Sequence, residues 1–220
     1  MTEIIQKLKR KSIEEDNAVM DKLLEYNPFA KLLDIGCGDG KRTIRWAKCI
    51  GTQDITGADA KYFGQPFKFV EGNIDNGLPF EDSTFDVVLA HHIIEHVSNT
   101  DLFVSEIHRV LKPGGYAGIT TPNMAAGKVI LELIINRQPL WAHVSDWFFV
   151  NNTFTDEILE KHKGFLHRRL FTVNGLQSLL EYYGFKIEHK KRHGYGILSF
   201  GKILRGLYAA NITMIARRLK

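Results

Sequence analysis

Residues 31–40 read KLLDIGCGDG, and the rest of the chain is organised around this stretch. An apolar strand begins at Leu32, Asp34 lies at its end, and three glycines alternate through the turn into a helix. Glycine is needed where the backbone takes left-handed dihedral angles, or where a ligand must come closer than a Cβ would allow. The N–H groups at the start of such a helix face an anionic group. The stretch therefore predicts a strand, turn and helix unit that holds a ligand on its main chain.

The spacing of the glycines separates two kinds of nucleotide site. A dinucleotide-binding turn reads G-x-G-x-x-G, and its third glycine would fall at Lys41, whereas the chain has Gly40. This spacing disfavours a nicotinamide oxidoreductase. Asp59 ends the second predicted strand, close to the ~20-residue offset at which an acid reaches the ribose in such folds. One carboxylate can accept from both ribose hydroxyls, so Asp59 is a candidate nucleoside-binding residue.

Composition favours one globular domain over residues 1–220, because 220 residues with 44% apolar content can bury a core. No apolar run reaches the ~18 residues of a membrane span, and the first residues lack the apolar segment of a signal peptide, so we expect a cytoplasmic protein. Cys37 and Cys49 form neither a disulfide framework nor a C-x-x-C metal pair. The net charge of +4 comes from scattered basic clusters, for which solvated surface is a commoner explanation than RNA or anionic lipid.

Strand and helix patterns alternate along the chain, which predicts a doubly wound α/β sheet. Strands are predicted at 32–34, 54–58, 67–70, 85–90, 116–121, 185–191 and 212–217, and helices at 3–26, 42–49, 102–111 and 172–183. The last two strands have no clear crossover between them, which suits an antiparallel edge pair. Residues 1–27 are predicted to form a helical lid, and residues 123–166 a substrate-side insertion with helices at 129–135 and 156–162.

Four motifs resemble the class I S-adenosylmethionine (SAM)-dependent methyltransferases. They are D-x-G-x-G-x-G at 34–40, GNIDNGLPF at 72–80, EHVSNTDLFVSEIHRVLKPGG at 95–115 and HRRLFTVNGLQSLLEYYGF at 167–185. The last is similar to the branch that methylates small molecules, lipid and quinone precursors and sugars. The resemblance implies a Rossmann-like, seven-stranded, mostly parallel sheet with an antiparallel last strand, helices on both faces and a helical insertion after the fifth strand.

The resemblance also implies SAM as cofactor and S-adenosylhomocysteine as product. In the family a GD loop contacts adenine, and here Asn73 stands where aspartate is usual, with one extra residue near Gly77. An asparagine carbonyl can still accept from the adenine amino group, with Ile74 as its apolar neighbour, and Asp75 is an alternative for the same role. The predicted cofactor-binding residues are Asp34, Gly36, Cys37, Gly38, Gly40, Asp59, Ala60, Asn73, Ile74, Ala90 and His91.

Histidines supply the candidates for catalysis. The methyl group on a sulfonium is already activated, so the protein mainly holds nucleophile, methyl carbon and sulfur in line, and a base is needed only for an acceptor such as a hydroxyl. His91 follows the fourth predicted strand at the end where ligands of open α/β sheets bind, and it is our first candidate for contact with cofactor or acceptor. His143 and His167 are candidates on the acceptor side. His167 and Arg169 match the family's H-x-R positions, for which a structural link to the insertion is as good an explanation as catalysis.

A metal ion is not predicted. His91, His92 and His96 have a spacing that could suggest metal ligands. No cysteine lies near them, however, and their position after the fourth strand explains them better.

These features predict a methyltransferase that acts by direct displacement on a small-molecule or lipid-like acceptor at oxygen, carbon or nitrogen. After the fourth predicted strand the chain has A-H-H and no N/D-P-P-Y motif, which argues against the amino-methylating nucleic-acid and glutamine enzymes that use that motif. Two alternatives stay open: methylation of a tRNA base, which the basic clusters allow, and a SAM-binding regulatory protein without turnover. The amphipathic segment 197–208 would suit an apolar acceptor or peripheral contact with a membrane surface, although packing on the domain is the commoner explanation.

Overall fold

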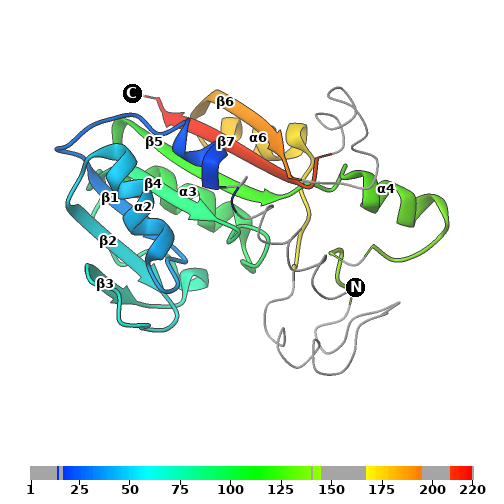
Figure 1. Cartoon of the computed structure of the whole chain (residues 1–220), viewed down its shortest axis with the longest axis horizontal. Coiled ribbons are helices and arrows are strands. Elements are labelled where there is room, and N and C mark those ends of the chain that lie inside the picture. Colours follow the sequence, from blue (N-terminus) through cyan, green and yellow to red (C-terminus); the bar gives the residue numbers. More distant parts are fainter. Residues whose placement is uncertain (1–13, 15–16, 140, 145–166, 195–208, 220) are drawn as a thin grey trace.

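Seven strands form one sheet in the order β3-β2-β1-β4-β5-β7-β6 (Figure 1). The structure is a computed structural model that describes residues 14, 17–139, 141–144, 167–194 and 209–219. Strands β1 to β5 are parallel, and β7 is antiparallel to both its neighbours, as predicted for the last strand. The strands are β1 Lys31–Ile35, β2 Asp54–Asp59, β3 Lys68–Glu71, β4 Phe85–His91, β5 Leu111–Pro122, β6 Phe185–His193 and β7 Asn211–Arg218.

The helices within the described residues are α2 Lys41–Ile50, α3 Thr100–Val110, α4 Gly127–Ile134 and α6 Val173–Tyr182, with a 3-10 helix η1 at Ile74–Asn76. Residues 17–21 are also helical. In Figure 1, α4 lies at the opposite end of the molecule from β3, and it confirms the predicted first helix of the insertion. The helix predicted at 3–26 ends at residue 21, and residues 22–27 of the predicted lid form a turn and irregular structure. Residues 1–13 and 15–16 of the lid, the second insertion helix and the segment 197–208 lie outside the described residues. None of the described helices has the length and apolar character needed to cross a bilayer.

Alternate residues of the central strands face opposite layers of the molecule. Leu32 and Val87 pack in one buried cluster with Trp46 of α2. Their chain neighbours Leu33 and Val88 pack in the other cluster, which contains residues of α3 and α6. This period of two is the geometry of a strand, and strands buried on both faces read as nearly continuous apolar runs. The helices therefore cover both faces, as predicted.

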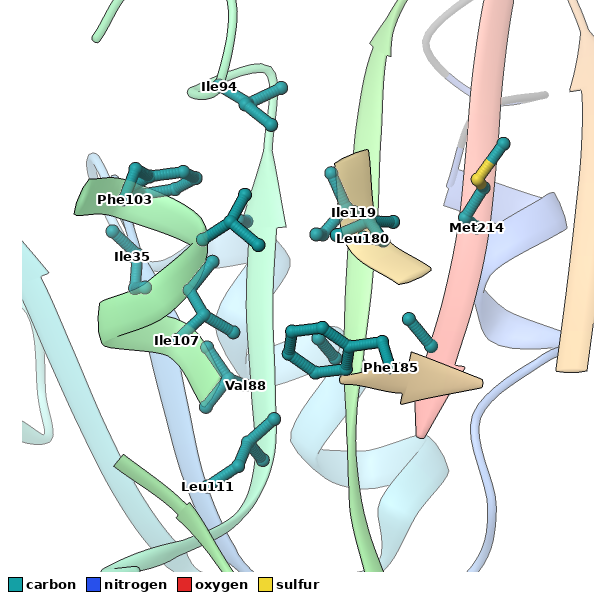
Figure 2. Close-up of a cluster of buried hydrophobic side chains, with 14 of the residues drawn as sticks. Ile35, Val88, Ile94, Phe103, Ile107, Leu111, Ile119, Leu180, Phe185 and Met214 are labelled. Carbon is teal, nitrogen blue, oxygen red and sulfur yellow. The ribbon is translucent and has the colours of Figure 1, made fainter. Parts of the chain in front are cut away.

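The larger cluster joins two helices to one face of the sheet. Figure 2 shows Ile107 of α3 close to Val88 of β4, with Phe103 farther along the same helix and Leu180 of α6 and Ile119 of β5 in the same cluster. Full burial of one such side chain stabilises the fold by about 1.5–3 kcal/mol. This packing holds the sheet in place, so the loops at its edge start from rigid positions.

The boundaries of α3 differ from those predicted at 102–111. The helix begins at Thr100, because the Asn99 side chain accepts from the main-chain N–H of Leu102 at 3.0 Å and caps the first turn. It ends at Val110, and Leu111 is already extended with φ −71° and ψ 142°. Leu111 pairs with Phe85 of β4, so it starts β5 before the proline and glycines that were predicted to stop the helix.

Candidate cofactor and acceptor site

The turn between β1 and α2 takes left-handed dihedral angles at its glycines, with φ of +73° at Gly36, +54° at Gly38 and +76° at Gly40. A Cβ on Gly36 would lie 2.0 Å from Cδ1 of Ile93. A Cβ on Gly38 would meet no described atom within 4 Å. Gly36 is thus required by a side-chain contact as well as by its dihedral angle, whereas Gly38 has open space beside its main chain.

Asp59 connects this turn to the end of β2. Its Oδ2 accepts from the main-chain N–H of Gly38 at 2.8 Å, and its Oδ1 accepts from that of Ala60 at 2.7 Å. The parallel pairing of Ile35 with Ala58 brings the two strand ends together. Each carboxylate oxygen has two accepting positions, so both keep one for a ligand hydroxyl.

A cavity of about 560 Å³ lies at the carboxyl ends of β1, β2 and β4. Its volume falls within the ~300–1,000 Å³ of small-molecule sites. The lining comes from the glycine turn, the end of β2, the η1 segment and the loop after β4. The cavity thus occupies the place where open α/β sheets bind ligands.

Seven of the predicted cofactor-binding residues line this cavity: Gly36, Gly38, Asp59, Ala60, Asn73, Ile74 and His91. The other four, Asp34, Cys37, Gly40 and Ala90, are not among its lining residues. The structure therefore separates residues that can touch a ligand from residues that shape the turn.

Asp34 is buried beneath the turn and bonded to α2. Its Oδ2 accepts from the hydroxyl of Thr43 at 2.5 Å. Burial raises the pKa of Asp34 to about 7, although the Thr43 hydrogen bond and the charge of Arg42 lower it in part. Burial also raises the pKa of Cys37 to about 12, with the nearby carboxylates of Asp34 and Asp59 adding to the effect. Cys37 is consequently a neutral thiol in the turn and not a nucleophile.

The η1 segment uses its polar side chains partly for its own structure. Oδ1 of Asn73 accepts from the main-chain N–H of Asp75 at 3.0 Å and caps η1. The Asn73 carbonyl keeps one further accepting position. Asp75, the alternative for the adenine contact, accepts from the main-chain N–H and the hydroxyl of Ser98, both at 2.7 Å. These bonds tie η1 to the segment before α3.

Arg109 supports the side of the cavity that η1 and Leu78 line. It was not among the residues predicted from the sequence. Its Nη2 donates to the carbonyl of Leu78 at 2.9 Å and its Nη1 to that of Phe80 at 2.8 Å. Its other donors reach Asp82 and Glu106. The signal was present, because Arg109 is the arginine of the RVLKPGG motif.

Two more side chains were missed. Nη1 of Arg42 lies 2.6 Å from Nδ1 of His91. A guanidinium only donates, so this nitrogen of His91 accepts and the proton of the neutral ring is on Nε2. Buried Gln65 donates from Nε2 to the carbonyl of Gly38 at 2.5 Å. Gln65 lies in a loop between two strands, where no sequence pattern marks it.

His143 and His167 lie together, but neither is among the residues that line the cavity. Nδ1 of His143 accepts from the main-chain N–H of His167 at 2.7 Å. The ring of Trp141 stacks on that of His167, with centroids 5.2 Å apart. Burial lowers the pKa of His167 to about 4. His96, which does line the cavity, packs edge-to-face on His167 at 4.9 Å.

Main-chain bonds attach the segment that carries His167 to the loop after β4. The N–H of Arg168 donates to the carbonyl of Glu95 at 2.7 Å, and Nη1 of Arg169 donates to that of Val97 at 3.0 Å. Arg169 therefore forms the structural link that was one of the two explanations for the H-x-R positions.

The fold and the site together define a class of protein. A sheet of order β3-β2-β1-β4-β5-β7-β6, a glycine turn after β1 and an acid at the end of β2 are the features of a Rossmann-like fold. Gly38 leaves open space and Asp59 keeps two accepting positions, so the residues present fit the nucleoside part of a cofactor such as SAM.

Comparison with known proteins shows which proteins the chain resembles. Residues 33–119 match the family described as "Methyltransferase domain". Demethylmenaquinone methyltransferase of Lactobacillus johnsonii is 28% identical over 77% of this chain and 74% of that protein. Sterol 24-C-methyltransferase of Gibberella zeae is 34% identical over 42% of this chain, and the match spans only 27% of that protein.

A solved structure shares the fold. 1,6-Didemethyltoxoflavin-N1-methyltransferase of Burkholderia thailandensis, with bound 1,6-didemethyltoxoflavin and S-adenosylhomocysteine, aligns with a TM-score of 0.60 and 18% identity, over 93% of this chain and 76% of that one. In residues 33–119 and in its fold, the chain is therefore similar to SAM-dependent methyltransferases.

Proposed function

We propose that this chain transfers the methyl group of SAM to a small-molecule or lipid-like acceptor, at oxygen, carbon or nitrogen. One observation carries the proposal: Gly38, Asp59 and the histidines after β4 line the same cavity of about 560 Å³. A cofactor held by Gly38 and Asp59 would therefore share this cavity with an acceptor that lies beside the histidines. The names of the relatives, which refer to a sterol and to demethylmenaquinone, support a lipid-like acceptor.

Cofactor binding is assigned to the turn, the end of β2 and η1. Bound SAM supplies a methyl group already activated on a sulfonium sulfur, so the residues of the chain act mainly by positioning. Each oxygen of the Asp59 carboxylate accepts one main-chain hydrogen bond, from Gly38 or from Ala60, and its remaining lone pair accepts a hydrogen bond from a ribose hydroxyl. Asn73 accepts from the adenine amino group through its second carbonyl position.

The histidines after β4 are assigned to the acceptor. His91 lines the cavity and is held by Arg42 through its Nδ1, so we assign it contact with the cofactor or acceptor. His92 lies 3.0 Å from Oε1 of Glu95 through its Nδ1. His92 lines the cavity and is oriented by Glu95, so it is the residue placed to take a proton from a hydroxyl acceptor. An acceptor carbon or amine that is already nucleophilic needs no base.

Transfer of labelled methyl from SAM tests the proposal. The purified chain is incubated with methyl-labelled SAM and, separately, with a quinol, a sterol, a small phenol, an amine and bulk tRNA. We expect label in an organic-extractable or small-molecule product, lost in Asp59→Ala and kept in Asp54→Ala, which removes an exposed acid at the other end of β2. Label in tRNA alone would replace the proposal with nucleic-acid methylation. Binding of S-adenosylhomocysteine without transfer to any acceptor would favour a regulatory protein.

A further inference from the structure

Three potential metal ligands from distant parts of the chain meet beside the cavity. Glu95 and His96 belong to the loop after β4, and His167 to the segment before α6. Each offers one ligand atom, and these atoms all lie within 4.8 Å of one another. The Glu95 carboxylate is fully buried, and His167 is 8% exposed.

His167 carries an unsatisfied nitrogen in this cluster. Its Nδ1 is buried and finds no hydrogen-bond partner among the atoms that the structure describes. Leaving a buried polar atom without a partner costs about 1–3 kcal/mol, and a bound ion beside Nδ1 of His167 would remove this cost.

The surroundings hold Glu95 and His167 in place. Oε2 of Glu95 accepts from the hydroxyl of Thr121 at 2.9 Å, and Oε1 lies 3.0 Å from Nδ1 of His92. The main-chain N–H of His167 donates to His143. His92 itself has a φ of +57°, a strained conformation for a residue with a side chain. Outer hydrogen bonds of this kind orient the ligands of metal sites.

We propose that Glu95, His96 and His167 bind a divalent transition-metal ion, and that Zn²⁺ fits the site best. Two imidazoles and one carboxylate are the donors that Zn²⁺ takes. Nε2 of His96 is 4.0 Å from Oε1 of Glu95, whereas two ligand atoms at zinc bonding distance are about 3.3 Å apart, so small side-chain rotations complete the site.

Three protein ligands leave one position of a tetrahedral ion for water or substrate. His96 also lines the cavity, so that position lies next to the space assigned to the acceptor. A metal there would bind an acceptor oxygen and make it more acidic. The site goes beyond the proposed methyl transfer, and metal binding does not depend on that activity.

The sequence reasoning considered His91, His92 and His96 and predicted no metal. The structure brings together a different set, because His167 returns to Glu95 and His96 through main-chain bonds between residues that are far apart in the chain.

Calorimetry with Zn²⁺ tests the site on the full chain, without a histidine tag and after removal of metal with a chelator. We expect one tight site in the wild type and at least a tenfold weaker affinity in His167→Ala and in Glu95→Gln. The matched control is His189→Ala, which removes an exposed histidine of β6 and should bind as the wild type. Binding of S-adenosylhomocysteine by each variant shows that it is folded.

The result that would overturn the proposal is a wild type that binds no Zn²⁺, or variants that bind it as tightly as the wild type does. If the variants fail to fold, anomalous diffraction from Zn²⁺-soaked wild-type crystals decides, because the proposal requires the ion at Glu95, His96 and His167. Cofactor binding is measured separately in the metal-free protein, so failure of the metal site and failure of the proposed methyl transfer are distinguishable.

Discussion

The carboxylate of Asp59 accepts a hydrogen bond from the main-chain N–H of Gly38 at 2.8 Å, across the ends of two parallel strands. One side chain therefore both fixes the glycine turn and faces the cavity. Asp59 is thus at once a structural support and the residue assigned to the ribose.

Replacement of Asp59 should remove cofactor binding. Hydrogen bonds to a charged group contribute about 1.5–3 kcal/mol each, so the loss of two ribose contacts in Asp59→Ala should weaken S-adenosylhomocysteine binding about 100-fold or more. Calorimetric titration measures the affinity for S-adenosylhomocysteine, and NAD serves as a negative control that should not bind. Asp54→Ala is the control and should bind normally. Equal affinity in wild type and Asp59→Ala would remove Asp59 from the site.

The two glycines with different surroundings should respond differently to alanine. Both Gly36→Ala and Gly38→Ala carry the ~1–2 kcal/mol cost of a left-handed residue, but only Gly36→Ala also overlaps Ile93. We expect Gly36→Ala to lower the free energy of unfolding more, as measured in urea. Gly38→Ala should mainly weaken cofactor binding, because its methyl group enters open space.

Ile93→Ala in the Gly36→Ala background provides the check. It should remove the destabilisation caused by the overlap with Ile93. The destabilisation caused by the left-handed dihedral angle of residue 36 should remain. If both single variants lost the same stability, Ile93 would not be the reason for glycine at position 36.

The buried carboxyl of Asp34 should make stability depend on pH. Its pKa rises from 3.8 to about 7 on folding, so the folded state binds its proton more tightly than the unfolded state does. The stabilisation is complete below about pH 4 and is lost as the pH rises through about 7. Asp34→Asn stays neutral, so we expect it to gain stability over the wild type between pH 5 and pH 8, by at most about 4 kcal/mol.

Urea unfolding of both proteins across this pH range measures the difference. Asp54→Asn, at an exposed position of β2, should follow the wild-type curve. Parallel curves for wild type and Asp34→Asn would contradict a protonated Asp34 in the folded state.

Arg109 should be irreplaceable by lysine. Its planar guanidinium reaches the carbonyls of Leu78 and Phe80 and the side chains of Asp82 and Glu106 at the same time. Lysine lacks this fork of donors. We expect Arg109→Lys to lower the free energy of unfolding by about 1–3 kcal/mol and to weaken cofactor binding, because Leu78 lines the cavity.

Arg45→Lys is the matched control. Among the described residues, Arg45 on the exposed surface of α2 forms an ion pair only with Asp21, and such pairs contribute about 0–1 kcal/mol. If Arg45→Lys lost as much stability as Arg109→Lys, the hydrogen bonds of Arg109 to Leu78 and Phe80 would contribute no more than an exposed ion pair.

Local patterns were sufficient to predict the sheet, the glycine turn and Asp59. Strand and helix periods depend on neighbouring residues, and the burial of Leu32 and Leu33 in opposite clusters follows from the period of two. The distance from Gly40 to Asp59 is set by one helix and one strand, so the sequence alone determined that the acid would reach the turn.

The tertiary structure alone decided the contacts between loops. His167 meets Glu95 and His96, Arg109 reaches Leu78, and Gln65 bonds to Gly38. No period connects these residues, because each pair depends on how an irregular segment closes over the sheet. A side chain far along the chain finds its partner only when the packed sheet has placed both segments, and for that reason the sequence predicted the contact between the glycine turn and β2 but not the contacts between the loops.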